Sequence, residues 1–217
     1  MTTDLRAVQF ASAGRSPLQL EGRLHLPAGG GPFPGAVIAH PHPLWGGTMD
    51  TPVLIRIAQA LAERGWVALR FNFRGVGRSR GGYDEGRGET DDLIGALDAL
   101  AAQNEVDPAR LAVVGYSFGA WVAGQATAVD DRVRAYVAVA LPMSEPYRVD
   151  LSHFSRPKCF LAGARDTVSP PELLRRYVGA LPEPKTLHII PGTDHFLLGY
   201  EQEMADRVAD FLASSVL

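Results

Sequence analysis

Apolar and polar residues alternate along residues 18–26, where leucines at 18, 20, 24 and 26 share one face of an extended chain. A period of two over this length predicts a half-exposed antiparallel strand. Residues 7–11, just before it, are the expected partner strand. His25 falls on the polar face of the pattern, so we expect its side chain to be exposed to solvent.

From residue 35 onward the pattern changes to short, almost uninterrupted apolar runs separated by amphipathic or alanine-rich stretches. Such runs are typical of strands buried on both faces of a parallel sheet, and the stretches between them are typical of helices. The apolar runs occupy residues 35–40, 67–71, 111–114, 134–141, 158–162 and 186–190. The helical stretches occupy residues 51–63, 88–103, those that follow 119, 170–178 and a last one that ends near 212.

This order of elements predicts an α/β fold, with a mostly parallel sheet of about eight strands and helices on both faces. The chain of 217 residues is long enough for one such domain and too short for two comfortable ones. No linker, internal repeat or low-complexity tract interrupts the pattern. We therefore expect a single domain over residues 1–217.

Composition and charge narrow the classes of partner. A formal net charge of -3 gives no electrostatic reason to expect nucleic acid or an anionic membrane surface. No apolar run approaches the roughly 18 residues of a membrane span, and residues 1–6 lack the apolar core of an export signal. The single cysteine, Cys159, lies in an apolar run and is expected in the core. A lone thiol fits a reducing compartment, so we expect a cytoplasmic protein, either a monomer or a homodimer.

The first candidate for chemistry is the pentapeptide Gly115-Tyr-Ser-Phe-Gly119, which lies between a buried apolar run and an alanine-rich helical stretch. A G-x-S-x-G sequence that joins a strand to a helix is typical of a nucleophile elbow. The two glycines leave room for the sharp turn, and the serine hydroxyl projects clear of the sheet. Ser117 is therefore the candidate nucleophile.

Two further residues, Asp166 and His195, each follow the end of a predicted strand, as Ser117 does. Reactive groups of a parallel sheet collect beyond the carboxyl ends of its strands. A serine hydroxyl needs an imidazole to take its proton, and the imidazole needs a carboxylate that fixes its tautomer and stabilises its cation. Asp194 is a competing carboxylate, but it adjoins His195 and is poorly placed to reach the far ring nitrogen. We therefore choose Asp166.

A site for acyl transfer also needs backbone N–H groups directed at the oxygen on which negative charge develops. Phe118, the residue after the nucleophile, is expected to supply one of them. The second is expected from the loop after the strand at 35–40. The two prolines of that loop have no N–H, which leaves His42 or Leu44. We favour Leu44 slightly, with His42 as the alternative.

Neither a cofactor nor a metal is predicted. The loop after residues 67–71 contains a Gly-x-Gly pattern, but Arg80 stands where the third glycine of a dinucleotide site belongs and no helix begins there. His40, His42 and His195 suggest a metal site, but the carboxylate or thiolate ligands that would complete it are missing nearby.

Several motifs occur together along the chain, at His40-Pro-His-Pro, Gly46-Gly-Thr-Met49, Arg70-Phe-Asn-Phe-Arg-Gly-Val-Gly77, Gly115-Tyr-Ser-Phe-Gly119, Gly163-Ala-Arg-Asp166 and Thr193-Asp-His195. In this combination the chain resembles an α/β-hydrolase, and specifically the small uncapped serine hydrolases related to dienelactone hydrolase. Several of those are described as carboxylesterases. The resemblance spans nearly the whole chain and implies an α/β-hydrolase fold without a cap domain.

Two positions depart from the family pattern. Dienelactone hydrolase itself uses a cysteine nucleophile where this chain has Ser117, so its substrate is not carried over. Many α/β-hydrolases have an aspartate where this chain has Asn72, so the structural role of that carboxylate is not carried over either.

The connection between the strands that end near residue 141 and begin near 158 is only about sixteen residues long, whereas capped relatives insert whole subdomains there. Trp45, and Met143, Pro146, Tyr147 and Phe154 of this connection, are candidates to line a shallow pocket. A packed connecting loop is the alternative for the last four. An uncovered site buries less of its ligand, which favours small or short-chain acyl esters, or bulky substrates with one exposed scissile group.

We therefore expect a serine hydrolase of carboxylic esters, with a small-molecule ester as its substrate. In this hypothesis Ser117 attacks the acyl carbonyl, His195 acts as general base and Asp166 orients the imidazole. A thioesterase, lactonase or peptidase with the same triad stays open, because pocket shape rather than the triad selects the leaving group. A non-catalytic binding module on this scaffold is a further alternative, although such modules usually lose a triad residue.

Overall fold

The computed structural model describes residues 4–216. Met1–Thr3, the start of the segment in which no export signal is expected, and Leu217 lie outside the described residues. None of the helices within residues 4–216 is both long enough and apolar enough to cross a membrane.

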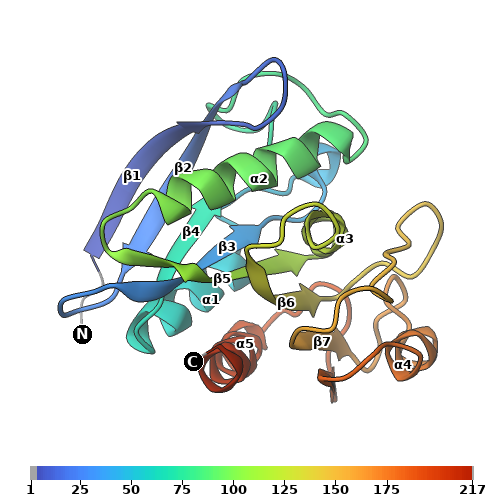
Figure 1. Cartoon of the computed structure of the whole chain (residues 1–217). Helices are drawn as coiled ribbons and strands as arrows, with labels where there is room; N and C mark the ends of the chain where they lie inside the picture. The colour runs from blue at the N-terminus through green and yellow to red at the C-terminus, as the bar shows by residue number, and fades with distance from the viewer. Residues whose placement is uncertain (1–3, 217) are drawn as a thin grey trace.

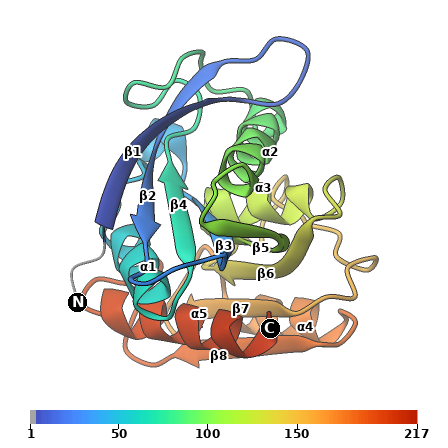
Figure 2. The same cartoon turned by 60° about the vertical axis from the view of Figure 1, so that its left-hand side comes forward.

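Within the described residues, eight strands form one sheet in the order β1-β2-β4-β3-β5-β6-β7-β8 (Figures 1 and 2). The strands are β1 (Asp4–Ala11), β2 (Gln19–Leu26), β3 (Phe33–Ala39), β4 (Val67–Phe71), β5 (Val106–Tyr116), β6 (Val133–Val139), β7 (Lys158–Gly163) and β8 (Lys185–Ile190). The first strand pairs antiparallel with β2, and β2 pairs antiparallel with β4, while all other neighbours pair in parallel. The predicted mostly parallel sheet and its antiparallel leading strands are confirmed.

Helices cover both faces of the sheet, as predicted (Figure 1). They are α1 (Pro52–Glu63), α2 (Arg87–Ala101), α3 (Phe118–Ala126), α4 (Pro171–Gly179) and α5 (Glu201–Ser215), with a short 3-10 turn η1 at Pro43–Trp45. Buried hydrophobic residues form two cores. The first core lies beneath α2, α3 and α4, and the second beneath α1 and α5. In β3, Val37 and Ala39 belong to the first core and Ala36 and Ile38 to the second. Burial on both faces is why the central strands are uninterrupted apolar runs.

Cys159 lies in β7 and its side chain is fully buried in the second core. Burial raises the pKa of its thiol to about 12, because an apolar environment disfavours the charged thiolate. The prediction that Cys159 is a core residue is confirmed.

The connection between β6 and β7, residues 140–157, contains neither a helix nor a strand. Phe154 of this connection is buried in the first core, whereas Met143 and Tyr147 are only partly buried. Phe154 therefore fits the alternative of a packed connecting loop and not that of a pocket lining. No cap is inserted at this point of the fold, so no cap covers the carboxyl ends of the central strands.

The prediction that His25 is exposed is wrong, because its side chain is only 4% exposed. Its ring nitrogen Nε2 accepts a hydrogen bond from Arg70 Nε at 3.0 Å. The guanidinium of Arg70 also donates to the carbonyl of Met49, and it pairs with Asp50 at 3.0 Å. Burial and the neighbouring Arg70 cation lower the pKa of His25 to about 4. The end of β2 that carries His25 is thus covered by later segments of the chain, whereas Gln19 at its start is exposed.

Asn72, one of the two departures from the family pattern, is buried just after β4. Its Oδ1 accepts from the N–H of Met49 at 2.8 Å, and its Nδ2 donates to the carboxylate of Glu21 at 2.7 Å. An aspartate cannot donate, and it would place a second negative charge against Glu21. The amide therefore suits this position better than a carboxylate does.

His40, at the carboxyl end of β3, joins two loops through its buried ring. Its Nδ1–H donates to the carbonyl of Pro41 at 2.6 Å, and its Nε2 accepts from the N–H of Phe73 at 3.1 Å. A ring that donates at one nitrogen and accepts at the other is neutral. Burial is the main cause that lowers the pKa of His40 to about 4. The neutral ring thus ties the loop after β3 to the loop after β4.

This arrangement predicts a pH dependence of stability. The pKa of His40 is lower in the folded chain than its ordinary value of 6.5, so the unfolded chain binds the proton first. The free energy of unfolding therefore falls as the pH drops from about 6.5 toward 4. Between pH 7.5 and pH 5, the wild-type protein is expected to lose about 2 kcal/mol more than His40→Gln, measured by urea unfolding at each pH. His153→Gln, at an exposed loop position, is the control and should follow the wild type. Parallel pH profiles for wild type and His40→Gln would contradict the prediction.

Candidate active site

Ser117 occupies the sharp turn between β5 and α3 and adopts a left-handed backbone conformation, with φ 55° and ψ −119°. Such a conformation is strained for a residue other than glycine and persists only where its surroundings hold it. The N–H of Ser117 donates to the carbonyl of Val139 at 2.8 Å, which anchors the turn to β6. The strain directs the hydroxyl out of the sheet, as the elbow motif predicts.

The two glycines of the elbow are required by close backbone approaches. A Cβ on Gly115 would lie 2.1 Å from the carbonyl oxygen of Gly119. A Cβ on Gly119 would lie 2.3 Å from the carbonyl oxygen of Ala39 and 2.5 Å from that of His40. These distances are far inside van der Waals contact, so a larger residue at 115 would push α3 away from β5, and one at 119 would push α3 away from β3.

The structure brings Ser117, His195 and Asp166 together in one hydrogen-bonded series. The hydroxyl of Ser117 lies 3.0 Å from Nε2 of His195, and Nδ1 of His195 lies 3.0 and 3.1 Å from the two carboxylate oxygens of Asp166. Since a carboxylate only accepts, Nδ1 carries the proton and Nε2 is free to accept the proton of the serine. Each residue follows a strand of the parallel part of the sheet: β5, β7 and β8.

Asp166 is buried and held in place by its own loop. Its Oδ1 accepts from the N–H groups of Val168 at 2.8 Å and Ser169 at 2.7 Å. Asp194, the competing carboxylate, is directed elsewhere: its Oδ1 accepts from the N–H of Phe196 at 3.0 Å. The geometry therefore favours Asp166 as the partner of His195.

Tyr116 fixes the loop that carries His195, a contact that the sequence pattern does not reveal. Its hydroxyl donates to the carbonyl of His195 at 2.7 Å. Burial, together with the carboxylates of Asp166 and Asp194, raises the pKa of Tyr116 above its ordinary value, so the hydroxyl keeps the proton that it donates. The strand residue before the nucleophile thus positions the histidine.

The candidate oxyanion donors differ in whether their N–H groups are free. The N–H of Leu44 donates to Nδ1 of the His42 ring at 3.2 Å, so it is already engaged. Among the hydrogen bonds of residues 4–216, the backbone N–H groups of His42 and Phe118 have no acceptor. The rings of these two residues lie 4.8 Å apart between centroids. The structure therefore leaves His42 rather than Leu44 with a free donor beside Phe118.

Aromatic rings pack against the imidazole of His42. Trp45 stacks on the imidazole with centroids 4.5 Å apart and an interplanar angle of 21°, and Tyr83 lies 5.0 Å away. Burial lowers the pKa of His42, in agreement with a neutral ring whose Nδ1 accepts from Leu44. Tyr83 also contacts Phe118, with centroids 5.9 Å apart.

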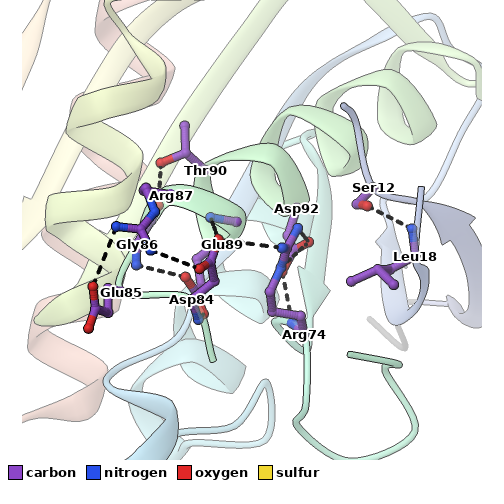
Figure 3. A network of polar contacts seen from close by, with 11 residues as sticks. Ser12, Leu18, Arg74, Asp84, Glu85, Gly86, Arg87, Glu89, Thr90 and Asp92 are labelled. Atoms are coloured by element: carbon purple, nitrogen blue, oxygen red, sulfur yellow. Dashed lines mark hydrogen bonds and ion pairs between the residues drawn. The ribbon is translucent and has the colours of Figure 1, made fainter. Parts of the chain in front are cut away.

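A polar network fixes the long segment between β4 and α2 on which Tyr83 lies (Figure 3). The guanidinium of Arg74 pairs with the buried carboxylate of Asp92 at 2.8 Å. The buried carboxylate of Glu89 accepts from the N–H groups of Asp84 at 2.9 Å and Gly86 at 2.8 Å. Both carboxylates lie on α2, so this helix holds the two ends of the segment.

Two cavities lie beside Ser117. The first, which we call the His195-side cavity, has a volume of about 500 Å³ and is lined by His42, Trp45, Tyr116, Ser117, His195, Phe196 and Leu198, among others. The second, the Phe118-side cavity, has a volume of about 460 Å³ and is lined by His42, Trp45, Ser117, Phe118, Met143, Tyr147, Val168 and Leu173, among others. The three predicted lining residues, Trp45, Met143 and Tyr147, thus all line one cavity together with Ser117.

The histidines that suggested a metal site have other partners. His40 is buried between two loops, and His42 is stacked under Trp45. Within the described part of the chain, no group of three or more His, Cys, Asp or Glu side chains is arranged to hold a metal ion.

Comparison with known proteins places this geometry in a family. Residues 36–211 match the family described as alpha/beta hydrolase domain. An uncharacterized protein of Rickettsia prowazekii is 32% identical over 187 residues, which cover 82% of this chain and 78% of that protein. A solved alpha-beta serine hydrolase homologue of Coxiella burnetii is 33% identical, with a TM-score of 0.82 over 94% of this chain and 96% of its own.

A second solved structure belongs to a protein without a lid. This serine hydrolase without a lid, from Xanthomonas campestris, is 28% identical, with a TM-score of 0.83 over 97% of this chain and 95% of its own. The lack of a cap between β6 and β7 in this chain agrees with the absence of a lid in the Xanthomonas campestris protein. With most of its length matched by the family and with relatives above 30% identity, the chain belongs to the alpha/beta hydrolase domain family, as a homologue of serine hydrolases without a lid.

Proposed function

We propose that this protein hydrolyses carboxylic esters, small or short-chain acyl esters in particular, through an acyl-enzyme on Ser117. The observation that carries the proposal is the unbroken series of hydrogen bonds from the Ser117 hydroxyl through His195 to Asp166. Serine activation by an oriented imidazole is the chemistry that this arrangement serves best. The site has no cap between β6 and β7 and so buries less of its ligand, which favours small acyl groups.

In the acylation step, Ser117 Oγ attacks the carbonyl carbon of the ester while its proton passes to Nε2 of His195. Asp166 stabilises the resulting imidazolium and keeps the ring oriented. The imidazolium then donates this proton to the alkoxide oxygen as the ester bond breaks, and the alcohol leaves. The acyl group stays on Ser117.

In the deacylation step, water takes the place of the alcohol. His195 Nε2 accepts a proton from the water as its oxygen attacks the acyl carbon, and returns it to Ser117 Oγ as the acid leaves. The same two steps cleave thioesters, lactones and peptide bonds, so a substrate survey should include all four classes.

The oxyanion of both tetrahedral intermediates needs two N–H donors, for which we propose Phe118 and His42. Phe118 is the first residue of α3, where the backbone N–H groups have no acceptor within the helix. His42 is proposed in place of Leu44, because the Leu44 N–H is engaged by the His42 ring.

Ser117→Ala is expected to lower kcat/KM for p-nitrophenyl acetate by roughly 10⁴–10⁶-fold, because it removes the nucleophile while the cavity remains. Ser144→Ala, which removes an exposed hydroxyl from the lining of the Phe118-side cavity, is the matched control and should keep most of the turnover. A fluorophosphonate adduct on Ser117, located by peptide mapping, would exclude the non-catalytic binding module. Turnover that survives in Ser117→Ala would identify another nucleophile.

Asp166→Asn is expected to lower kcat by about 10⁴-fold, by analogy with other serine triads, because the amide stabilises the wrong tautomer of the imidazole. Asp194→Asn should change kcat by less than about threefold, since that carboxylate accepts only a local backbone N–H. Both variants should be assayed on the same ester at several pH values. A larger loss in Asp194→Asn would reverse the choice of the acid.

Two substitutions at residue 42 test the oxyanion donor. His42→Ala removes the ring but keeps the N–H, whereas His42→Pro removes both, and the φ of −54° at this residue is compatible with proline. The proline variant should have a kcat about 10²–10³-fold below that of the alanine variant. Thermal melting of both variants checks that the loop still folds, and equal kcat values would return the role to Leu44.

A further inference from the structure

The two cavities beside Ser117 differ in which catalytic group lines them. His195 and the next residues, Phe196 and Leu198, line only the His195-side cavity. Phe118, Met143 and Tyr147 line the Phe118-side cavity and are absent from the lining of the His195-side cavity. An ester bound at Ser117 extends in two directions from its carbonyl carbon, so each cavity has room for one half of it.

Proton transfer to the leaving oxygen determines which cavity binds the alcohol half of the ester and which binds the acyl half. The leaving oxygen receives that proton from Nε2 of His195, so the alcohol half must lie within reach of the imidazole. The acyl half stays bonded to Ser117 and extends away from the imidazole, into the cavity that Phe118 lines. A general acid must lie within hydrogen-bond distance of the atom that receives its proton.

The lining of the Phe118-side cavity suits a hydrocarbon chain. Pro142, Met143, Val168 and Leu173 supply apolar surface, and Tyr147 adds an aromatic ring. A further cavity of about 730 Å³ lies next to it and shares four lining residues with it: Pro142, Met143, Tyr147 and Leu173. These shared side chains form the wall between the two cavities.

Met143 is the part of this wall that is easiest to remove. Its main chain is fixed by an N–H that donates to the carbonyl of Val168 at 3.1 Å, so its side chain can be shortened without releasing the loop. Tyr147, by contrast, packs edge-on against Trp121 at 5.4 Å and Phe118 at 6.4 Å between ring centroids. Its loss would disturb the elbow helix.

We propose that the Phe118-side cavity binds the acyl chain, that the His195-side cavity binds the alcohol, and that the Met143 side chain limits the length of the acyl chain. This assignment rests on the proposed ester hydrolysis. It makes Met143 a specificity residue for the acyl group, and Leu198 its counterpart for the alcohol. Leu198 is 76% exposed, so truncating it leaves the core intact.

The test measures kcat/KM in two substrate series, because this constant reports acylation in both. One series is p-nitrophenyl esters from acetate to laurate, in which only the acyl chain changes. The other is acetates from methyl to hexyl acetate, followed by acid release, in which only the alcohol changes. The wild type, Met143→Ala and Leu198→Ala are compared, with Met143→Leu as a control that conserves side-chain volume.

Met143→Ala should raise the kcat/KM ratio of octanoate to butyrate at least tenfold, since each newly buried methylene contributes up to about fourfold. In the same variant the ratio of hexyl to methyl acetate should stay within about twofold of the wild type, because both esters carry the same acetyl group. Met143→Leu should keep the wild-type chain limit. Leu198→Ala should lower the ratio of hexyl to methyl acetate about threefold. It should leave the chain-length ratios of the acyl series unchanged, because every member of that series carries the same p-nitrophenyl group.

A Met143→Ala variant that alters the ratio of hexyl to methyl acetate instead, or a Leu198→Ala variant that alters the ratio of octanoate to butyrate, would overturn the assignment. An unchanged chain limit in a folded Met143→Ala, verified by thermal melting, would overturn the role of Met143. If Met143→Ala does not fold, Met143→Phe, which should shorten the chain limit, and Leu198→Ala still decide the assignment. A wild-type protein that hydrolyses no ester of either series overturns the proposed function itself, which is seen before any variant is compared.

Discussion

Close contact between three backbone segments at the elbow is the constraint on which the rest of the site depends. The carbonyl of Gly119 lies where a Cβ of Gly115 would be, and the carbonyls of Ala39 and His40 lie against Gly119. This packing holds Ser117 in its left-handed conformation, and it brings the end of β3 next to the start of α3. The nucleophile and the loop proposed to supply an oxyanion donor are therefore positioned by the same contact.

Polar groups buried around the elbow keep the surrounding loops in one arrangement. Neutral His40 joins the loops after β3 and β4, and Asn72 joins the second of these to Met49. Glu89 and Asp92 of α2 hold the segment that carries Tyr83. Each of these buried groups has several partners, and removing one such group would leave each of its buried partners unpaired at a cost of about 1–3 kcal/mol. Such rigid support is what a preorganised site requires.

The sequence predicts the sheet and the meeting of Ser117, Asp166 and His195, because both follow from local patterns: apolar runs, and residues that come directly after them. It fails at His25, since a period of two separates the faces of a strand without telling which later segment will cover each face. The choice between His42 and Leu44 depends on how one side chain turns back on its own loop. The roles of Tyr83 and Tyr116 come from contacts between segments that no spacing encodes.

The two sides of the site also differ in exposure, and the difference matches the two steps of ester hydrolysis. Phe196 and Leu198, which line the His195-side cavity, are 68% and 76% exposed. In the Phe118-side cavity, Val168 and Leu173 are 40% and 44% exposed, and Met143 and Tyr147 are partly buried. Exposed apolar residues that gather at a cavity are typical of ligand-binding surfaces. The alcohol must leave before water can reach the acyl carbon, so its side of the site benefits from an open rim beside His195. The acyl group must stay in place through both steps, so its side benefits from walls that are fixed.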